Sequence, residues 1–354
     1  MSGDGSMIAD SARIFLSRIG GVARARKLRD SGMAFDAGAW NEMAKLGWFG
    51  LVVPEEAGGL GLGGHELVAL METLGAQLAG EPVGDSIAAS VLLSRAEGSS
   101  SLLEEVIAGS AMVALVLDAS FKLAGGRISG LSRPVVSLAE ATHALIEITG
   151  ENGAVYVVPL RSTGVELRTQ ATVDGRTVSE LHLDLPLEAL SRIKMQNVSL
   201  ALGNVQAVAR LAAAAYLVGL ADAAFAIALG YLKTRKQFGV AIGSFQALQH
   251  RAATVFVRIA SVRALISECA RTFGTERLDA ASAAAACAAS EMALQVTKEC
   301  IQFHGAIGFA DEHDIGLYLR RAMSTIASIG DAGSCLDAFS KAASVGTEKI
   351  SSTA

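Results

Sequence analysis

Arg235-Lys-Gln-Phe-Gly239 is the stretch that decides the fold, together with the later stretch Gln302-Phe-His-Gly-Ala-Ile-Gly-Phe309. In both, cationic or amide side chains lie beside glycines within an alanine-rich half of the sequence that is predicted to be helical. A guanidinium group suits phosphate oxygens because its planar donors match them in pairs. Glycine lets a backbone approach a ligand closely. The two stretches therefore indicate binding of a buried pyrophosphate group.

The composition limits the class of protein. The 354 residues are enough for about two or three domains. Hydrophobic residues (51%) far outnumber charged ones (18%), so much surface should be hidden, for example between subunits. A net charge of −5 argues against nonspecific nucleic-acid binding, which needs clustered cations. The short basic run at 24–29, Arg-Ala-Arg-Lys-Leu-Arg, is predicted to be a solvated helix face.

Cysteine and histidine spacing predicts no metal site. No two histidines have the spacing of metal ligands, and no cysteines form a CxxC pair or a zinc pattern. Reduced thiols in a cytosolic protein are the favoured interpretation. The N-terminal stretch lacks the basic and apolar regions of a signal peptide, so we predict a cytoplasmic protein. The cysteines are Cys269, Cys287, Cys300 and Cys335.

One segment resembles a membrane span in length. Residues Leu211–Leu232 are almost wholly apolar and are interrupted only by Asp222. They consist largely of alanine and other small residues, with Arg210 and Lys233 at either end. Because a buried core helix is also hydrophobic all round, we predict a core helix and no membrane span.

Three regions differ in their sequence pattern. Residues 1–112 are predicted to be helical, and residues 113–190 contain short β-prone runs separated by turns. Residues 191–354 return to a helical pattern with short loops, which is typical of a bundle. The predicted fold class is α+β, mostly α, with an N-terminal helical domain, a small middle β domain and a C-terminal four-helix bundle. The C-terminal helices are predicted over residues 198–234, 246–273, 279–304 and 314–327, with a last one near 333–345.

This order of regions, with its short motifs, resembles the acyl-CoA dehydrogenase family over nearly the whole chain. Each motif is weak alone, but together and in the right order they identify the family. The N-terminal motifs are Trp40, Gly47-Trp-Phe-Gly-Leu51, Val53-Pro-Glu-Glu56 and Gly58-Gly-Leu-Gly-Leu62. The C-terminal motifs are Arg235-x-x-Phe238-Gly239 and Gln302-x-x-Gly305-x-x-Gly308-Phe309.

The resemblance implies an FAD cofactor between the β domain and the helical bundle, closed over by a neighbouring subunit. It also implies an acyl-CoA thioester substrate and an electron-transfer acceptor. Arg235 would then pair with the pyrophosphate, and the glycines would let the backbone come close to the cofactor. The residues that the resemblance assigns to the cofactor are Arg235, Gln237, Phe238, Gln246, Gln302, Gly305 and Ala306.

The catalytic base of the family is missing at both places where members carry it. Members remove an α-proton with a glutamate, whose usual position corresponds to Ile329, followed here by Gly330. In a minority of members the position corresponds to Ala209. Isoleucine and alanine cannot act as general bases, so no catalytic residue is assigned. Asp331 is a candidate substitute, displaced by two residues.

The predicted β domain also departs from the family. Members that hold a flavin ring show a Thr-Glu-Pro…Gly-Ser-Asp run, whereas this chain passes from residues 113–118 directly to 121–130. Arg133-Pro-Val-Val136 replaces the aromatic-x-Thr turn of the family. The groups expected to bond the flavin ring are therefore missing or replaced.

Three functions remain open. The first is the non-catalytic subunit of a heterotetrameric (α2β2) acyl-CoA dehydrogenase, of the bacterial type that acts on steroid-CoA thioesters, which completes the FAD site of a second family subunit. The second is a self-sufficient homotetramer with Asp331 as a relocated base. The third is a non-redox scaffold, against which the retention of Arg235 and Gln246 argues. The first explains why the losses fall on one half-site while the residues offered to a neighbour's cofactor remain.

Overall fold

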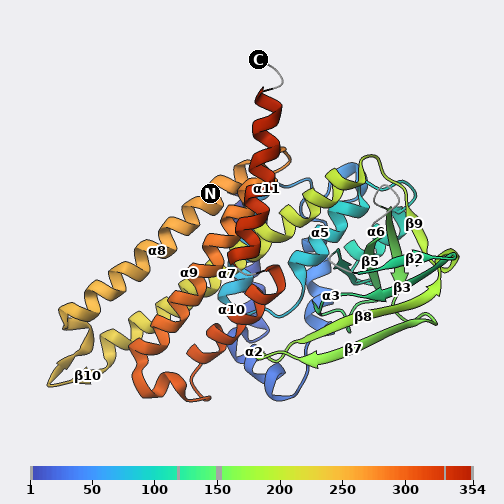
Figure 1. Ribbon diagram of the computed structural model, residues 1–354. Coiled ribbons are helices and arrows are strands. Elements are labelled where there is room, and N and C mark those ends of the chain that lie inside the picture. Colours follow the sequence, from blue (N-terminus) through green and yellow to red (C-terminus); the bar gives the residue numbers. More distant parts are fainter. Residues whose placement is uncertain (1–2, 118–119, 149–153, 331, 352–354) are drawn as a thin grey trace. The chain divides into compact units, whose positions relative to one another are not determined.

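The computed structural model describes residues 3–117, 120–148, 154–330 and 332–351 (Figure 1). The chain divides into two compact units. The first unit combines Met1–Lys27, Gly64–Ala79 and Arg210–Ala354, and the second combines Leu28–Gly63 and Gly80–Ala209.

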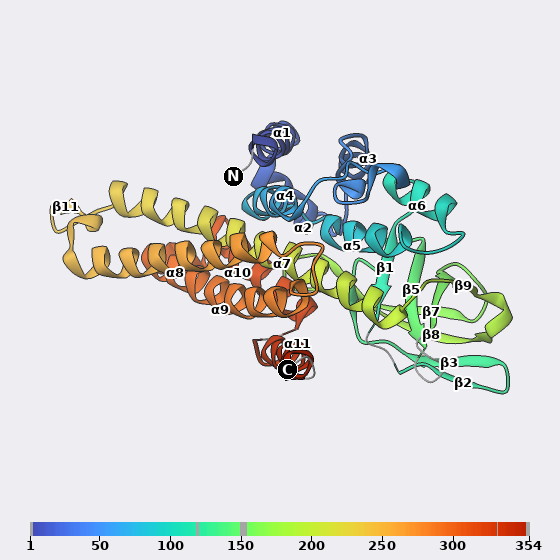
Figure 2. The same cartoon turned by 90° about the horizontal axis from the view of Figure 1, so that it is seen from above.

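Long helices build the first unit. Helix α9 packs against α8, α10 and α11, and α4 packs against α1 and α8. Helices α7, α8 and α9 run side by side, and the chain between α7 and α8 forms a small hairpin at one end of them (Figure 2). The helices are α1 (Gly3–Arg18), α2 (Gly21–Asp30), α4 (Gly64–Ala76), α7 (Val198–Thr234), α8 (Gln246–Arg271), α9 (Leu278–His304), α10 (Ile315–Ile329) and α11 (Ala332–Ser351), of which α2 and α7 extend into the second unit.

Helix α7 is the apolar segment that resembled a membrane span. By length and composition it could cross a membrane, and 72% of its most apolar window is buried inside the protein. The hydrophobic side chains in its middle, such as Leu211, Leu217 and Leu220, are fully buried. Burial on all sides is what allows a helix without a polar face to remain in a folded protein.

Glycines set the distance at which α4 and α7 cross. A Cβ atom at Gly219 of α7 would overlap the carbonyl oxygen of Glu72, and one at Gly75 of α4 would overlap the carbonyl oxygen of Tyr216. The two backbones therefore touch, and only a residue without a side chain fits at either position. Tyr216 also donates from its hydroxyl to the Ala79 carbonyl at 2.8 Å, which ties α7 to the end of the α4 segment.

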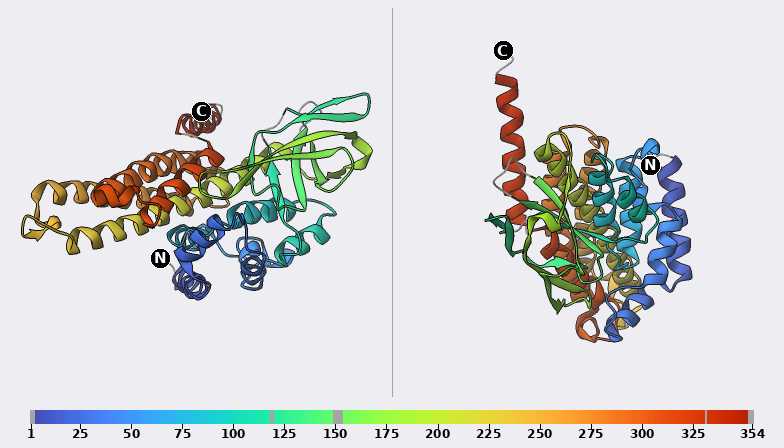
Figure 3. Two further views of the ribbon diagram at one scale, coloured as in Figure 1. Left: turned by 90° about the horizontal axis from the view of Figure 1, so that it is seen from below. Right: turned by 90° about the vertical axis from the view of Figure 1, so that its right-hand side faces the viewer.

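Short helices and two sheets build the second unit (strands in green in Figure 3). The first sheet has the order β1-β5-β6-β9, in which β1 and β5 are parallel and the other pairs are antiparallel. The second has the antiparallel order β2-β3-β8-β4, with β7 also paired to β8. The helices are α3 (Ala37–Lys45), α5 (Val83–Leu93) and α6 (Ser100–Ile107). The strands are β1 (Val113–Val116), β2 (Lys122–Ala124), β3 (Arg127–Leu131), β4 (Val135–Val136), β5 (His143–Ile148), β6 (Ala154–Pro159), β7 (Val165–Ala171), β8 (Thr177–Pro186) and β9 (Ser191–Ile193).

The predicted fold class is confirmed: helices precede a middle β region, and helices follow it. The C-terminal helices lie where the periodicity placed them, because each predicted range corresponds to one of α7 to α11. The predicted domain boundaries after residues 112 and 190 stay predictions.

Candidate functional site

The first predicted cofactor stretch forms a tight hairpin at the end of α7. Strands β10 (Lys236–Gln237) and β11 (Val240–Ala241) are antiparallel, and Phe238 and Gly239 make the turn with φ of +53° and +83°. Two residues with positive φ match the twist that a two-residue hairpin needs. The backbone of Arg235 is held on both sides, since its N–H donates to Tyr231 O and its carbonyl accepts from Ile242 N, both at 2.8 Å.

The side chains of this hairpin point to solvent. Phe238 is 92% exposed and meets Phe245 edge-on at 6.2 Å between ring centroids. Gln237 donates to the Lys236 carbonyl at 2.9 Å, and Gln246, the first residue of α8, is exposed. Among the described residues the Arg235 guanidinium has no hydrogen bond and no ion pair. An exposed cation on a fixed backbone is available to an external anion.

The second predicted stretch follows the end of α9. Helix α9 ends at His304, and the chain turns into the short 3-10 helix η5 (Gly305–Phe309) through Gly305, whose φ of +62° and ψ of −139° suit glycine. Gln302, Gly305 and Ala306 are exposed. Gly308 is buried, and an added Cβ there would lie 2.7 Å from the Ile301 carbonyl oxygen, so its role is close packing.

His304 is buried beneath this turn and connects the two stretches. Its Nδ1 lies 2.7 Å from the Cys300 carbonyl, which can only accept, so Nδ1 carries the proton. The ring stacks on Tyr231 of α7 at 4.6 Å, and Tyr231 is the residue whose carbonyl accepts from Arg235. Both cofactor stretches are therefore anchored at the same end of the bundle.

The electrostatics of His304 favour the neutral ring. Burial lowers its pKa, the hydrogen bond to the Cys300 carbonyl opposes this, and the neighbouring His313, edge-on at 4.5 Å, lowers the pKa further. Its Nε2 atom is buried without a hydrogen-bond partner among the described residues. Of the histidines that the sequence offered, His304 is the one within a predicted cofactor loop, and its ring packs inside the bundle.

A groove between α8 and α9 borders the second stretch. Its lining carries more positive than negative charge, with one carboxylate against three cations. Arg251 is held by Glu299, with 2.5 Å between Nε and Oε1, and its guanidinium lies 5.4 Å from the centre of the Phe303 ring. The groove is lined by Arg251, Arg258, Gln295, Lys298, Glu299 and Gln302. Gln302 is thus both a predicted cofactor contact and one end of a basic groove.

The two positions where family members carry the base, Ile329 and Ala209, hold no titratable group. Ile329 is the last residue of α10 and is half-buried, as is Ala209 within α7. The substitute Asp331 lies outside the described residues. Neither described position can accept a proton.

The turn that replaces the aromatic-x-Thr motif is engaged within its own sheet. The Ser132 hydroxyl donates to the Arg133 carbonyl at 2.7 Å and accepts from Leu181 N at 2.9 Å. Val135 and Val136 pair with Ser179 and Val178 of β8. The Ser132 hydroxyl is thus used within the sheet, and Val135 and Val136 carry no side-chain donor for a flavin ring.

The thiols and the acidic clusters supply no other centre. Among the described residues no group of three or more His, Cys, Asp or Glu side chains could hold a metal ion. All four cysteines are free thiols. Burial raises the pKa of Cys269 to about 11 and that of Cys300 to about 12, so both stay protonated and unreactive.

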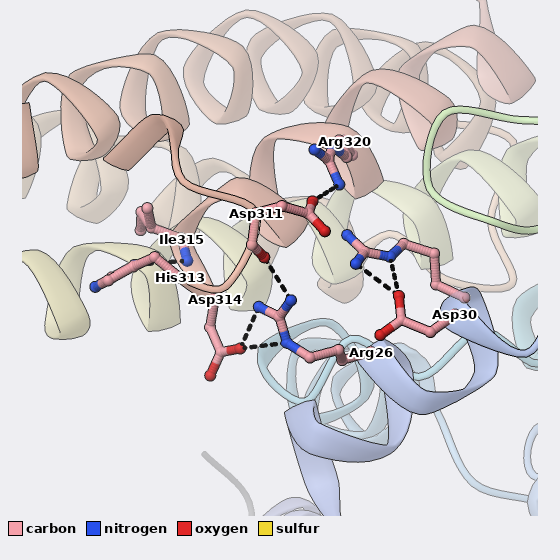
Figure 4. Close-up of polar contacts among 8 residues, drawn as sticks. Arg26, Asp30, Asp311, His313, Asp314, Ile315 and Arg320 are labelled. Carbon is pink, nitrogen blue, oxygen red and sulfur yellow. Dashed lines mark hydrogen bonds and ion pairs between the residues drawn. The ribbon is translucent and has the colours of Figure 1, made fainter. Parts of the chain in front are cut away.

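The basic run at residues 24–29 contains a contact that the sequence did not reveal. Arg26 was expected on a solvated helix face, but its side chain is only 22% exposed and pairs with Asp314 at 2.8 Å (Figure 4). Its Nη1 also donates to the Asp311 carbonyl at 2.5 Å. The partners are separated by 285 residues or more, so no local pattern could have identified them.

Comparison with known proteins matches two parts of the chain to domains of one protein family. Residues 2–111 match the family described as "Acyl-CoA dehydrogenase, N-terminal domain", and residues 200–344 match "Acyl-CoA dehydrogenase, C-terminal domain". The chain is 28% identical over 321 residues to the acyl-CoA dehydrogenase IpdE2 of Mycobacterium tuberculosis (strain ATCC 25618 / H37Rv), covering 89% of this chain and 90% of that protein.

Two solved structures are similar over nearly their whole length. A variant of the Tcur3481-Tcur3483 steroid ACAD aligns with a TM-score of 0.86 and 26% identity, covering 97% of this chain and 98% of that one. The ChsE4-ChsE5 complex from Mycobacterium tuberculosis aligns with a TM-score of 0.86 and 24% identity, covering 96% and 97%. At 24% identity, the similarity to the ChsE4-ChsE5 complex shows a common fold.

Proposed function

The chain belongs to the acyl-CoA dehydrogenase family, and we propose that it is the base-lacking subunit of a heteromer, in which it completes the FAD site of a partner subunit. The family makes the assembly an FAD-dependent oxidoreductase that acts on acyl-CoA thioesters. The observation that carries the proposal is a contrast: Arg235 is exposed and pairs with no described residue, and no carboxylate stands at positions 329 and 209.

The hairpin and the end of α9 fit the diphosphate part of FAD. Arg235 presents a guanidinium group that no described residue neutralises, on a backbone fixed by two hydrogen bonds. Gln302 lies at the edge of a groove with three cations and one carboxylate. A phosphate group gains most from such donors when they are fixed before it binds. These residues would hold the diphosphate and do no proton transfer.

The β region fits the flavin ring less well. The Ser132 hydroxyl is taken up within the sheet, and Val135 and Val136 offer no side-chain donor. FAD, when bound, would supply the acceptor for the hydride lost from the thioester's β-carbon. In this chain no described group at the family's base positions can remove the α-proton that must leave with it. The ring site and the base would therefore come from the partner.

The similar structures agree with a two-chain assembly. Both are named as pairs of different chains, and one is named as a steroid ACAD. A CoA thioester of a steroid-like acyl group is thus the substrate class that we propose.

The first test is the flavin content of the chain purified alone and after co-expression with a family subunit that retains its glutamate. We expect the lone chain to be colourless and the complex to be yellow, with a single FAD for each pair of unlike chains. Arg235→Ala should lower the flavin content of the complex, whereas Arg271→Ala, in an exposed pair with Glu268, should not.

Other outcomes select other functions. Stoichiometric flavin in the lone chain would overturn the proposal and favour the self-sufficient enzyme, for which Asp331→Asn is then the decisive variant. A stable complex, with no flavin in either the lone chain or the complex, would favour the non-redox scaffold.

A further inference from the structure

We propose that Arg26 of α2 is a positioning residue for the cofactor-facing turn at Gly305–Phe309. Arg26 belongs to an N-terminal helix, and it binds the segment that follows the turn, between α9 and α10. The inference rests on the proposed function, because that turn is a predicted FAD contact. Its basis is the cluster of polar contacts between α2 and the segment that joins the turn to α10 (Figure 4).

Arg26 clamps that segment at two points. Its Nε and Nη2 atoms donate to Asp314 Oδ1 at 3.2 Å and 2.8 Å, and its Nη1 donates to the Asp311 carbonyl at 2.5 Å. A guanidinium can make this fork because its donors are planar and fixed relative to each other. A lysine ammonium in the same place could not reach both acceptors with one geometry.

The segment is also held from α10. Arg320 donates to the Asp311 carboxylate at 2.8 Å, so one arginine takes the Asp311 carbonyl and another takes its side chain (Figure 4). Ion pairs that share a segment in this way restrict it more than an isolated surface pair does. Asp311 is the second residue after the turn, since η5 ends at Phe309.

A chain of ring contacts leads from this clamp to the turn. His313 lies between Asp311 and Asp314, and its Nδ1 accepts from Ile315 N at 3.2 Å. Its ring meets His304 edge-on at 4.5 Å, and His304 is the residue before Gly305. The clamp therefore fixes His313, His313 packs against His304, and His304 carries the start of the turn.

The polar clamp and the ring stack act on opposite ends of a short loop. The ring stack fixes where the loop begins, at the end of α9, and Arg26 fixes where it returns to α10. Between them, backbone hydrogen bonds run from Ala310 N to Ile307 O and from His313 N to Ala310 O, both at 3.1 Å. Loss of Arg26 removes its bonds to Asp314 and to the Asp311 carbonyl at the return end and increases the conformations that FAD binding must restrict.

The experiment measures the FAD dissociation constant of the heteromeric complex by flavin fluorescence. Arg26→Ala should weaken FAD binding on the order of tenfold, and Arg26→Lys should recover only part of that loss because it lacks the fork. Hydrogen exchange of residues 305–314 in the lone chain should increase in Arg26→Ala. The matched control is Arg13→Ala, which removes an exposed pair with Asp10 on α1 and should change neither readout.

Two further variants separate this inference from the proposed function and from simple misfolding. Asp314→Asn keeps the arginine and removes the charge it binds, so it should reproduce the weaker FAD binding if Arg26→Ala does not fold. Unchanged FAD affinity in Arg26→Ala or Asp314→Asn, with a clear loss in Arg235→Ala, overturns the role of Arg26 and leaves the proposed function standing. No effect of Arg235→Ala either means that the proposed function itself has failed.

Discussion

Helix α7 has two contrasting regions, its crossing with α4 and its C-terminal end. At the crossing Gly219 and Gly75 bring two backbones into contact, and the residues around them are buried. At the end the hairpin leaves Phe238 92% exposed and Arg235 without a partner among the described residues. The chain's own residues bury the first region. We call the second region incomplete because its side chains are exposed to solvent.

Hydrogen bonds reinforce the packing at the crossing. Arg321 of α10 is buried, and its Nη1 donates to the carbonyls of Leu78 and Ala79 and to the Tyr216 hydroxyl at 2.8 to 3.0 Å. These bonds hold Leu78 in a left-handed conformation with φ of +53°, which is unfavourable for leucine. Hydrogen bonds that hold a residue in an unfavourable conformation indicate that this region contributes to the stability of the fold. The exposed Phe238 ring buries little apolar surface in the lone chain and would bury more only against another molecule.

The largest effect on stability should come from Gly219→Ala. The new methyl group would overlap the Glu72 carbonyl, so α4 and α7 would have to separate. We expect the free energy of unfolding to fall by about 3 kcal/mol or more, as for overpacking against rigid backbone. Urea denaturation of the lone chain measures it.

Gly230→Ala is the matched control on the same helix. An added Cβ there meets nothing within 4 Å, so the better helix propensity of alanine should raise the stability by about 0.5 to 1 kcal/mol. Opposite signs for the two variants would establish the close crossing. Equal effects would mean that α4 and α7 do not approach as closely as the structure has them.

A smaller loss should follow Arg263→Ala, beside the crossing. Arg263 pairs with Glu72 of α4 and Asp222 of α7, both at 3.1 Å, and Glu72 is only 22% exposed. Burial raises the pKa of Glu72 and Arg263 opposes it, so removing Arg263 leaves a carboxylate poorly compensated. We expect a loss of about 1 to 3 kcal/mol, less than for a fully buried pair because Arg263 and Asp222 are partly solvated.

Arg271→Ala is the corresponding exposed case. Its pair with Glu268 leaves both side chains more than 60% exposed, and such a pair contributes about 0.5 kcal/mol or less. Denaturation midpoints of the two variants, measured in parallel at low and high salt, test the difference. If both lose the same stability, Glu72 is better solvated than its position indicates.

A still smaller effect concerns pH, at His304 near the incomplete end. Burial holds the pKa of His304 below its ordinary value, so the unfolded chain binds a proton more readily than the folded one. The stability that the neutral ring contributes is therefore complete above the unfolded pKa of about 6.5 and is lost as the pH falls through the folded value. His304→Asn keeps an amide donor for the Cys300 carbonyl but cannot titrate.

The comparison is made between about pH 7.5 and about pH 5.5, on either side of the ordinary imidazole pKa. The natural chain should lose more stability over this interval than His304→Asn does. Parallel pH profiles would show that His304 titrates normally and that its ring is not held neutral by burial.

The sequence predicted the regions governed by local pattern and missed those governed by distant pairing. Helical periodicity and small residues placed α7 to α11 and identified Leu211–Leu232 as a core helix. The glycine and amide motifs identified the family. The clamp of Arg26 on Asp314 and the pair of Arg263 with Glu72 join residues far apart in the chain, and an arginine on a helix looks the same from sequence whether or not such a partner exists.

The cofactor contacts themselves stay a prediction, and the contrast along α7 gives the sharpest way to test one of them. Phe238→Ala should change the stability of the lone chain by about 0.5 kcal/mol or less, because an almost fully exposed ring buries little area on folding. The same substitution should weaken flavin retention in the heteromeric complex, where the ring would be covered. Denaturation of the lone chain and flavin content of the complex are measured on the same preparation of the variant. If Phe238→Ala changes neither the stability nor the flavin content, the ring contributes neither to the fold nor to the partner's site. If it clearly lowers the stability of the lone chain, the ring is already covered within that chain.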